Sequence, residues 1–122
     1  MPELAEVEYY RKQWDPGLGG TVECVWTHPA ARIYRDTPAA AIERGLAGRC
    51  FVSSHAHGKQ MLFGFSGGAW LGLHLGMTGE LGIAPAGHEP GKHEHLVIRL
   101  GNVSLVFADP RMFGRVTLDL VA

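Results

Sequence analysis

From Gly48 onward, the chain is a succession of short apolar segments separated by residues that favour turns. Ser66-Gly67-Gly68 and Gly101-Asn102 each stand between two such segments, and this composition is typical of tight β-hairpins. The pattern therefore predicts a series of antiparallel strands. The expected strands are Arg49–His55, Gln60–Phe65, Trp70–Leu75, Glu80–Ile83, His95–Leu100, Val103–Ala108 and Gly114–Leu120.

The N-terminal part of the chain adds two short helices and one more strand. Residues 3–14 have the apolar spacing of a helix, with Leu4, Val7, Tyr10 or Arg11, and Trp14 on one side. Gly20–His28 alternates as a strand with Val22, Cys24 and Trp26 on one face. Thr37–Leu46 is expected to be a helix with Thr37 as its N-cap and Pro38 in its first position.

These elements together predict a mainly β fold in a single domain over residues 1–122. Its expected form is a two-sheet antiparallel β-sandwich of about eight strands, flanked by two short α-helices. Residues 84–91 hold two prolines and two glycines and are expected to form a loop. At 122 residues and 46% hydrophobic composition, the chain can bury a core of its own.

Composition also limits where the protein can work. No apolar stretch approaches the roughly 20 residues that span a bilayer, and the acidic N-terminus does not resemble a signal peptide. We therefore expect no membrane association and a cytoplasmic or otherwise intracellular location. Cys24 and Cys50 are expected to be buried free thiols of a reducing compartment, with a disulfide between them as the alternative.

The first eight residues, Met1 to Glu8, combine a potential nucleophile with nearby carboxylates. Removal of Met1 would leave Pro2 as a free secondary amine, which can form a cationic iminium with an aldehyde-like carbon. Glu3 and Glu6 are three residues apart and share one side of the first helical turn. They are either acidic residues that stabilise the helix start or, for Glu3, a general acid/base beside the amine.

Three other motifs have both a structural and a functional interpretation. Lys59, between two expected strands, is either a solvated charge or a cation that contacts a phosphate. Met77 lies between glycines after an expected strand, and is either core filler or an apolar wedge between bases. Arg111 and Phe113 would point the same way in an extended segment, as a base-edge donor beside a stacking ring, or would serve a structural turn.

The seven histidines raise the question of a metal site. His55 and His57 are two residues apart, as are His93 and His95, which is compatible with one face of a strand. The chain has neither a closely spaced cysteine pair nor a His-Glu-x-x-His pattern. We therefore predict no metal site.

Taken together, these motifs resemble the N-terminal domain of the formamidopyrimidine-DNA glycosylase/endonuclease VIII family. They occur in the family's order over essentially the whole chain. The matching segments are Pro2–Glu8, His57–Lys59, His74–Gly79, Lys92–His95 and Asp109–Arg115. The resemblance implies a β-sandwich flanked by helices that forms one wall of a DNA-binding cleft.

The resemblance also implies a role for each matched residue. Pro2 corresponds to the nucleophile that attacks C1′ of the damaged nucleotide, Glu3 to the acid/base for sugar-ring opening and Glu6 to a supporting carboxylate. Lys59 and His74 correspond to residues that hold phosphates beside the lesion. The residues matching those that fill the gap left by a flipped base are Met77, Arg111 and Phe113, and His93 matches a position that faces DNA.

The implied activity is that of a bifunctional glycosylase and abasic-site lyase of base-excision repair. The Asp-Pro-Arg-x-Phe-Gly form of residues 109–114 favours oxidised purines such as 8-oxoguanine and formamidopyrimidine as substrates. The expected partner is duplex DNA with an oxidised base or an abasic site, bound by a monomer. Alternatives are a non-catalytic module that binds damaged DNA and a β-sandwich interaction domain unrelated to DNA.

Departures from the family pattern limit these expectations. Ala5 stands where the family usually has a second proline, and Met112 replaces a common basic residue. The family's helix–two-turns–helix module and four-cysteine zinc finger have no counterpart here, so we expect a fragment that needs no cofactor, zinc belonging to the missing finger. With a net charge of −1, the isolated domain is expected to bind DNA weakly and to excise little or no base.

Overall fold

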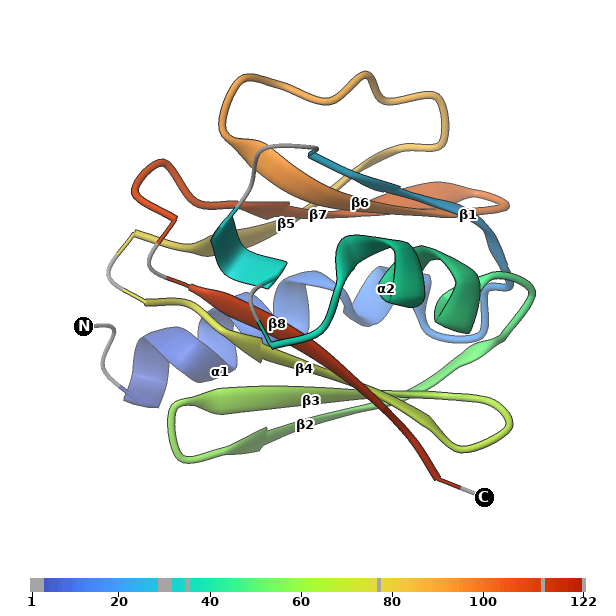
Figure 1. The fold of residues 1–122 in the computed structure, drawn as a ribbon, viewed down its shortest axis with the longest axis horizontal. Helices are drawn as coiled ribbons and strands as arrows, with labels where there is room; N and C mark the ends of the chain where they lie inside the picture. The colour runs from blue at the N-terminus through green and yellow to red at the C-terminus, as the bar shows by residue number, and fades with distance from the viewer. Residues whose placement is uncertain (1–3, 29–31, 35, 77, 113, 122) are drawn as a thin grey trace.

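Two four-stranded antiparallel sheets pack face to face in the computed structural model, which describes residues 4–28, 32–34, 36–76, 78–112 and 114–121 (Figure 1). One sheet has the order β1-β6-β7-β5 and the other β2-β3-β4-β8. The strands of the first sheet are β1 (Val22–Thr27), β5 (Glu80–Pro85), β6 (Glu94–Leu100) and β7 (Val103–Ala108). Those of the second are β2 (Phe51–His57), β3 (Gln60–Phe65), β4 (Ala69–His74) and β8 (Arg115–Leu120).

Two α-helices close the open sides of this sandwich. Helix α1 (Leu4–Gln13) packs against β5 and β2, which are edge strands of different sheets, and α2 (Ala39–Leu46) packs against the other two edges, β1 and β8. Short 3-10 turns, η1 (Asp15–Gly17) and η2 (Arg32–Tyr34), follow α1 and precede α2. Because each helix covers one strand edge of each sheet, the arrangement protects unpaired backbone groups as well as apolar side chains. The predicted fold class is confirmed.

The core lies between the sheets and is rich in aromatic rings. The rings of Phe51 and Phe65 stack with centroids 5.2 Å apart, and Phe63 lies 5.9 Å from Phe51. Trp14, just beyond α1, packs on Phe63 of one sheet and donates its indole N–H to the carbonyl of Val106 in the other, 3.2 Å away. Trp14 therefore fastens the end of α1 to both sheets, with its one polar atom satisfied.

The hairpins form where glycine predicts them. Gly101-Asn102 joins β6 to β7, and residues 66–68 join β3 to β4, with Gly67 and Gly68 at φ values of +79° and +85°. Only glycine adopts these φ values without strain, so the glycines in the sequence predicted where the turns form. Strand β5 runs to Pro85, into the expected loop, because an edge strand tolerates a proline that lacks a ladder donor.

Four local expectations are wrong. A β-bulge between Val22 and Cys24 shifts the alternation of β1, so that Cys24 is exposed and Val25 packs on the core instead. Both cysteines are free, but Cys50 is only half-buried. Leu4 is 59% exposed, because α1 contacts the sheets chiefly beyond its first turn.

The fourth correction concerns the start of α2. Pro38, rather than Thr37, occupies the N-cap position, and no side-chain cap bond forms there. The Thr37 hydroxyl instead accepts a hydrogen bond from the backbone N–H of Leu118 on β8, at 3.2 Å. Thr37 therefore serves the contact between the helix and the sheet rather than the helix end.

Candidate nucleic-acid interface

Several predicted site residues lie at one end of the sandwich, at the left of Figure 1. Lys59 occupies the two-residue turn between β2 and β3, and His74 is the last residue of β4. Gln60, next to Lys59, pairs with His74 across the sheet. The N-terminal end of α1, where Glu6 is exposed, lies at the same end of the molecule (Figure 1). Pro2 and Glu3 directly precede α1 in the sequence but lie outside the described residues, as do Met77 and Phe113.

A third basic residue, Arg115, joins Lys59 and His74. Arg115 begins β8 and is the direct cross-strand partner of His74. Its side chain is about half exposed and forms an ion pair, Nε to Oδ2 of Asp36, at 2.9 Å. Arg115 lies in the matched segment Asp109–Arg115 but received no role of its own there, although its basic side chain was an available signal. Lys59 and Arg115 place positive charge at this end of the second sheet, beside the His74 ring.

The His74 ring is held as a neutral hydrogen-bond donor. The backbone N–H of Gly76 donates to Nδ1 of His74 at 3.0 Å, so Nδ1 carries no proton and the neutral ring carries its proton on Nε2. Burial lowers the pKa of His74 below its ordinary value of 6.5, and the charges of Arg115 and Lys59 lower this pKa further. Near neutral pH, His74 therefore offers an N–H to an anion without adding charge.

We expect this arrangement to appear in the pH dependence of stability. Burial also lowers the pKa of His95, so below pH 6.5 the unfolded chain takes up protons that folded His74 and His95 do not. The free energy of unfolding should therefore fall as the pH is lowered from 6.5 toward the folded pKa values. Urea unfolding at several pH values measures this trend, and NMR titration assigns it; an Arg115→Gln variant should raise the pKa of His74. A pKa of His74 at or above 6.5 in the unaltered chain would contradict the description.

A buried aspartate organises the turn that carries Arg111. The side chain of Asp109 has no exposed surface, yet its carboxylate accepts hydrogen bonds from the Thr78 hydroxyl and from the backbone N–H of Gly114, both at 2.7 Å. The backbone N–H of Met112 donates to the Asp109 carbonyl at 3.1 Å, closing a turn that leaves Arg111 exposed. Of the two interpretations of this segment, the turn holds for Arg111 and Met112, and Met112 takes a φ of +56°.

The same aspartate connects the turn to strand β6. The backbone N–H of Asp109 donates to the carbonyl of His93 at 2.9 Å, and its carbonyl oxygen lies 2.8 Å from Nε2 of His95. A carbonyl only accepts, so the neutral His95 ring carries its proton on Nε2. His93 is exposed and His95 is buried, so the two histidines do not share a face. Arg111 and His93 thus project from neighbouring, hydrogen-bonded segments.

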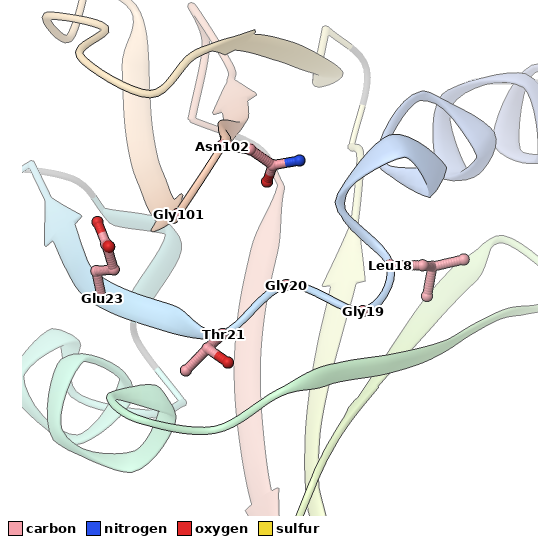
Figure 2. A pocket seen from close by; sticks show the side chains of 7 residues that line it. All are labelled: Leu18, Gly19, Gly20, Thr21, Glu23, Gly101 and Asn102. Atoms are coloured by element: carbon pink, nitrogen blue, oxygen red, sulfur yellow. The ribbon is translucent and has the colours of Figure 1, made fainter.

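An open pocket at the other end of the molecule has different chemistry (Figure 2). It has a volume of about 580 Å³ and lies where β1 begins and where β6 turns into β7. Its lining residues are Leu18, Gly19, Gly20, Thr21, Glu23, Gly101 and Asn102. The one charged residue of this lining is an acid, so the pocket does not suit a phosphate.

Neither a metal cluster nor a membrane-spanning helix occurs among the described residues. No group of three or more histidine, cysteine, aspartate or glutamate side chains in that part of the chain could hold a metal ion. Within the same residues, neither helix is long and apolar enough to cross a membrane.

Comparisons with known proteins agree with this geometry. The family model of the formamidopyrimidine-DNA glycosylase N-terminal domain matches residues 1–116. A formamidopyrimidine-DNA glycosylase of Herminiimonas arsenicoxydans is 41% identical over 118 residues, which are 95% of this chain and 42% of the relative. One of Carboxydothermus hydrogenoformans is 34% identical over 121 residues, 98% of this chain and 46% of the relative.

Solved structures show the same similarity in three dimensions. The Lactococcus lactis formamidopyrimidine-DNA glycosylase, non-covalently bound to DNA that contains an abasic site, matches with a TM-score of 0.88 and 26% identity. That match covers 98% of this chain and 45% of the other. A complex of the same enzyme with DNA containing formamidopyrimidine-dG also has a TM-score of 0.88. The chain therefore spans less than half the length of these relatives.

Proposed function

This chain belongs to the family of formamidopyrimidine-DNA glycosylase N-terminal domains, and on that premise we propose that it supplies the catalytic half of a base-excision repair enzyme. The proposed substrate is duplex DNA that contains an oxidised purine or an abasic site. The proposed location is the compartment that holds this DNA, which in a bacterium is the cytoplasm. The protein would act as a monomer and without a cofactor in this domain.

The proposed chemistry uses the free amine of Pro2. Its nitrogen attacks C1′ of the damaged nucleotide and the base leaves with the electrons of the glycosidic bond. The proton lost by the Pro2 nitrogen goes to the departing base. Glu3 then donates a proton to O4′ as the C1′–O4′ bond breaks, Glu6 supports Glu3, and the Pro2 nitrogen forms a cationic iminium with C1′. The iminium withdraws electrons from the sugar, so β- and then δ-elimination cut the strand. The damaged nucleotide must leave the base stack to reach the amine.

The observation that carries the proposal is the grouping of Lys59, His74 and Arg115 at the end of the molecule where α1 begins. Duplex DNA presents a dense row of phosphates, and cations that neutralise them dominate its binding. His74 adds a neutral donor of fixed direction. Arg111, in the turn between β7 and β8, and His93, just before β6, would contribute further DNA contacts, and Arg111 would face the unpaired base.

Replacement of Lys59 by glutamine tests the phosphate contact. We expect Lys59→Gln to weaken binding of damaged and undamaged duplexes alike and to reduce the slope of log affinity against log salt concentration by about 1. Fluorescence anisotropy with a labelled duplex at several salt concentrations measures both quantities. Arg44→Gln, on α2, removes a charge of the same sign elsewhere and should leave the slope unchanged. Equal slopes for the Lys59→Gln chain and the unaltered chain would remove Lys59 from the interface.

Borohydride trapping tests the catalytic proposal. A chain from which Met1 has been removed, mixed with abasic-site duplex and borohydride, should form a covalent adduct. Absence of the adduct together with preferential binding of abasic duplex would instead support a non-catalytic module that recognises damage. Absence of any DNA binding at low salt would contradict both proposals.

A further inference from the structure

One hydroxyl group joins two segments that are distant in the sequence. Thr78 lies in the connection between β4 and β5, and Asp109 begins the turn between β7 and β8. The Thr78 hydroxyl donates to Oδ1 of Asp109 at 2.7 Å, and the backbone N–H of Arg111 points to the same hydroxyl oxygen at 3.4 Å. Thr78 therefore contacts both Asp109, which begins the turn, and the backbone of the exposed Arg111.

The carboxylate of Asp109 makes this contact energetically important. It is fully buried, and among the described residues it has no lysine, arginine or histidine as an ion-pair partner. Its hydrogen-bond donors there are neutral, namely the Thr78 hydroxyl and the Gly114 N–H. Loss of one of these two hydrogen-bond donors would leave the buried carboxylate poorly solvated and raise the free energy of the folded state. The Asp109 carboxylate therefore stabilises the contact between the two segments, because it needs the Thr78 hydroxyl as well as the Gly114 N–H as donors.

The loop on the other side of the contact is also restrained. Gly79 donates its N–H to the carbonyl of Leu75 at 2.8 Å, and Leu75 is buried. This bond joins Leu75, which follows β4, to Gly79, which precedes β5, so Thr78 lies next to a restrained residue. Movement of Arg111 relative to this loop would require the Thr78–Asp109 bond to break.

We infer that Thr78 is a positioning residue that fixes the backbone just before β5 relative to Asp109 and Arg111 of the turn after β7, so that Arg111 meets DNA in a fixed orientation. Rigid placement would favour duplexes with a missing base, because only there is space open for the Arg111 side chain. The inference rests on the proposed function, since it concerns how the same surface distinguishes abasic from intact DNA.

Two substitutions of Thr78 test the inference. Thr78→Val keeps the shape of the side chain but removes the hydroxyl, and should lower the ratio of abasic to intact duplex affinity about fivefold. Thr78→Ser keeps the hydroxyl and should preserve the ratio. Thr117→Val removes a half-buried threonine hydroxyl on β8 and serves as the matched control. Anisotropy with duplexes that contain or lack a stable abasic analogue gives the ratios, and thermal unfolding verifies that every variant is folded.

Amide exchange supplies a readout that does not depend on DNA. Exchange at the N–H groups of Arg111 and Gly114 should accelerate in Thr78→Val and not in Thr78→Ser. An unchanged affinity ratio in Thr78→Val, or an equal loss in Thr78→Ser, would overturn the inference and leave the proposed function standing. If the unaltered chain itself shows no preference for abasic duplex, the proposed function and the inference both fail.

Discussion

Retention of Met1 is expected to reduce the borohydride-trapped adduct with abasic DNA by about a hundredfold or more relative to the chain that begins at Pro2. With Met1 attached, the nitrogen of Pro2 belongs to a tertiary amide, and its lone pair is delocalised into the carbonyl. It can then neither attack C1′ nor form an iminium. Intact-mass measurement identifies the two preparations, and denaturing gels quantify the adduct.

Two controls make this comparison specific. The two preparations should unfold at the same temperature, because Leu4 is largely exposed and the first turn of α1 buries little before Val7. An Arg44→Gln chain that begins at Pro2 should form as much adduct as the unaltered chain, since it keeps the amine and changes only a charge on α2. Equal adduct from the chain that retains Met1 would place the nucleophile elsewhere, on a lysine side chain.

Gly79→Ala is expected to destabilise the fold by about 3 kcal/mol, although it adds a single methyl group. A Cβ at Gly79 would lie 2.3 Å from the carbonyl oxygen of Leu75 and 2.9 Å from the ring of Phe107. The nearest atom belongs to the backbone, so rotation of a side chain cannot relieve the clash. The 75–79 loop would have to move, and Thr78 with it. Urea unfolding measures the loss.

Gly82→Ala is the matched control for this substitution. Gly82 lies three residues further along, in β5, and a Cβ there would meet no atom within 4 Å. The free energy of unfolding of the Gly82→Ala chain should stay within about 0.5 kcal/mol of that of the unaltered chain. If Gly79→Ala were as mild as Gly82→Ala, the loop would be able to relax, and its proposed rigidity would be wrong.

The strands of this fold were predictable because their signals are local. Gly67 and Gly68 permit a backbone conformation that other residues avoid, and the apolar segments on either side pair as neighbours. The face of β1 was not predictable in the same way. The bulge after Val22 inserts a residue without any breaker in the sequence, and every side chain beyond it changes face.

The residues of the candidate site also differ in whether local sequence was enough to identify them. Short motifs in the sequence identified Lys59, His74 and Arg111 as candidates. The structure then places Lys59 and His74 near each other across β3 and β4. Arg115 and Thr78 were missed. Both residues were recognised only through contacts with residues far away in the chain. Arg115 contacts Asp36, and Thr78 contacts Asp109.

The sequence by itself determined the fold class, the family resemblance and the chemical types of residue at the proposed DNA surface. Those depend on periodicity, turn composition and motif order, which are properties of neighbouring residues. Only the tertiary structure decided that Arg115 borders His74 and that the buried Asp109 binds the Thr78 loop to the Arg111 turn. Burial and strand register create these contacts, and the strength of a carboxylate's hydrogen bonds depends on the surroundings that the whole fold provides.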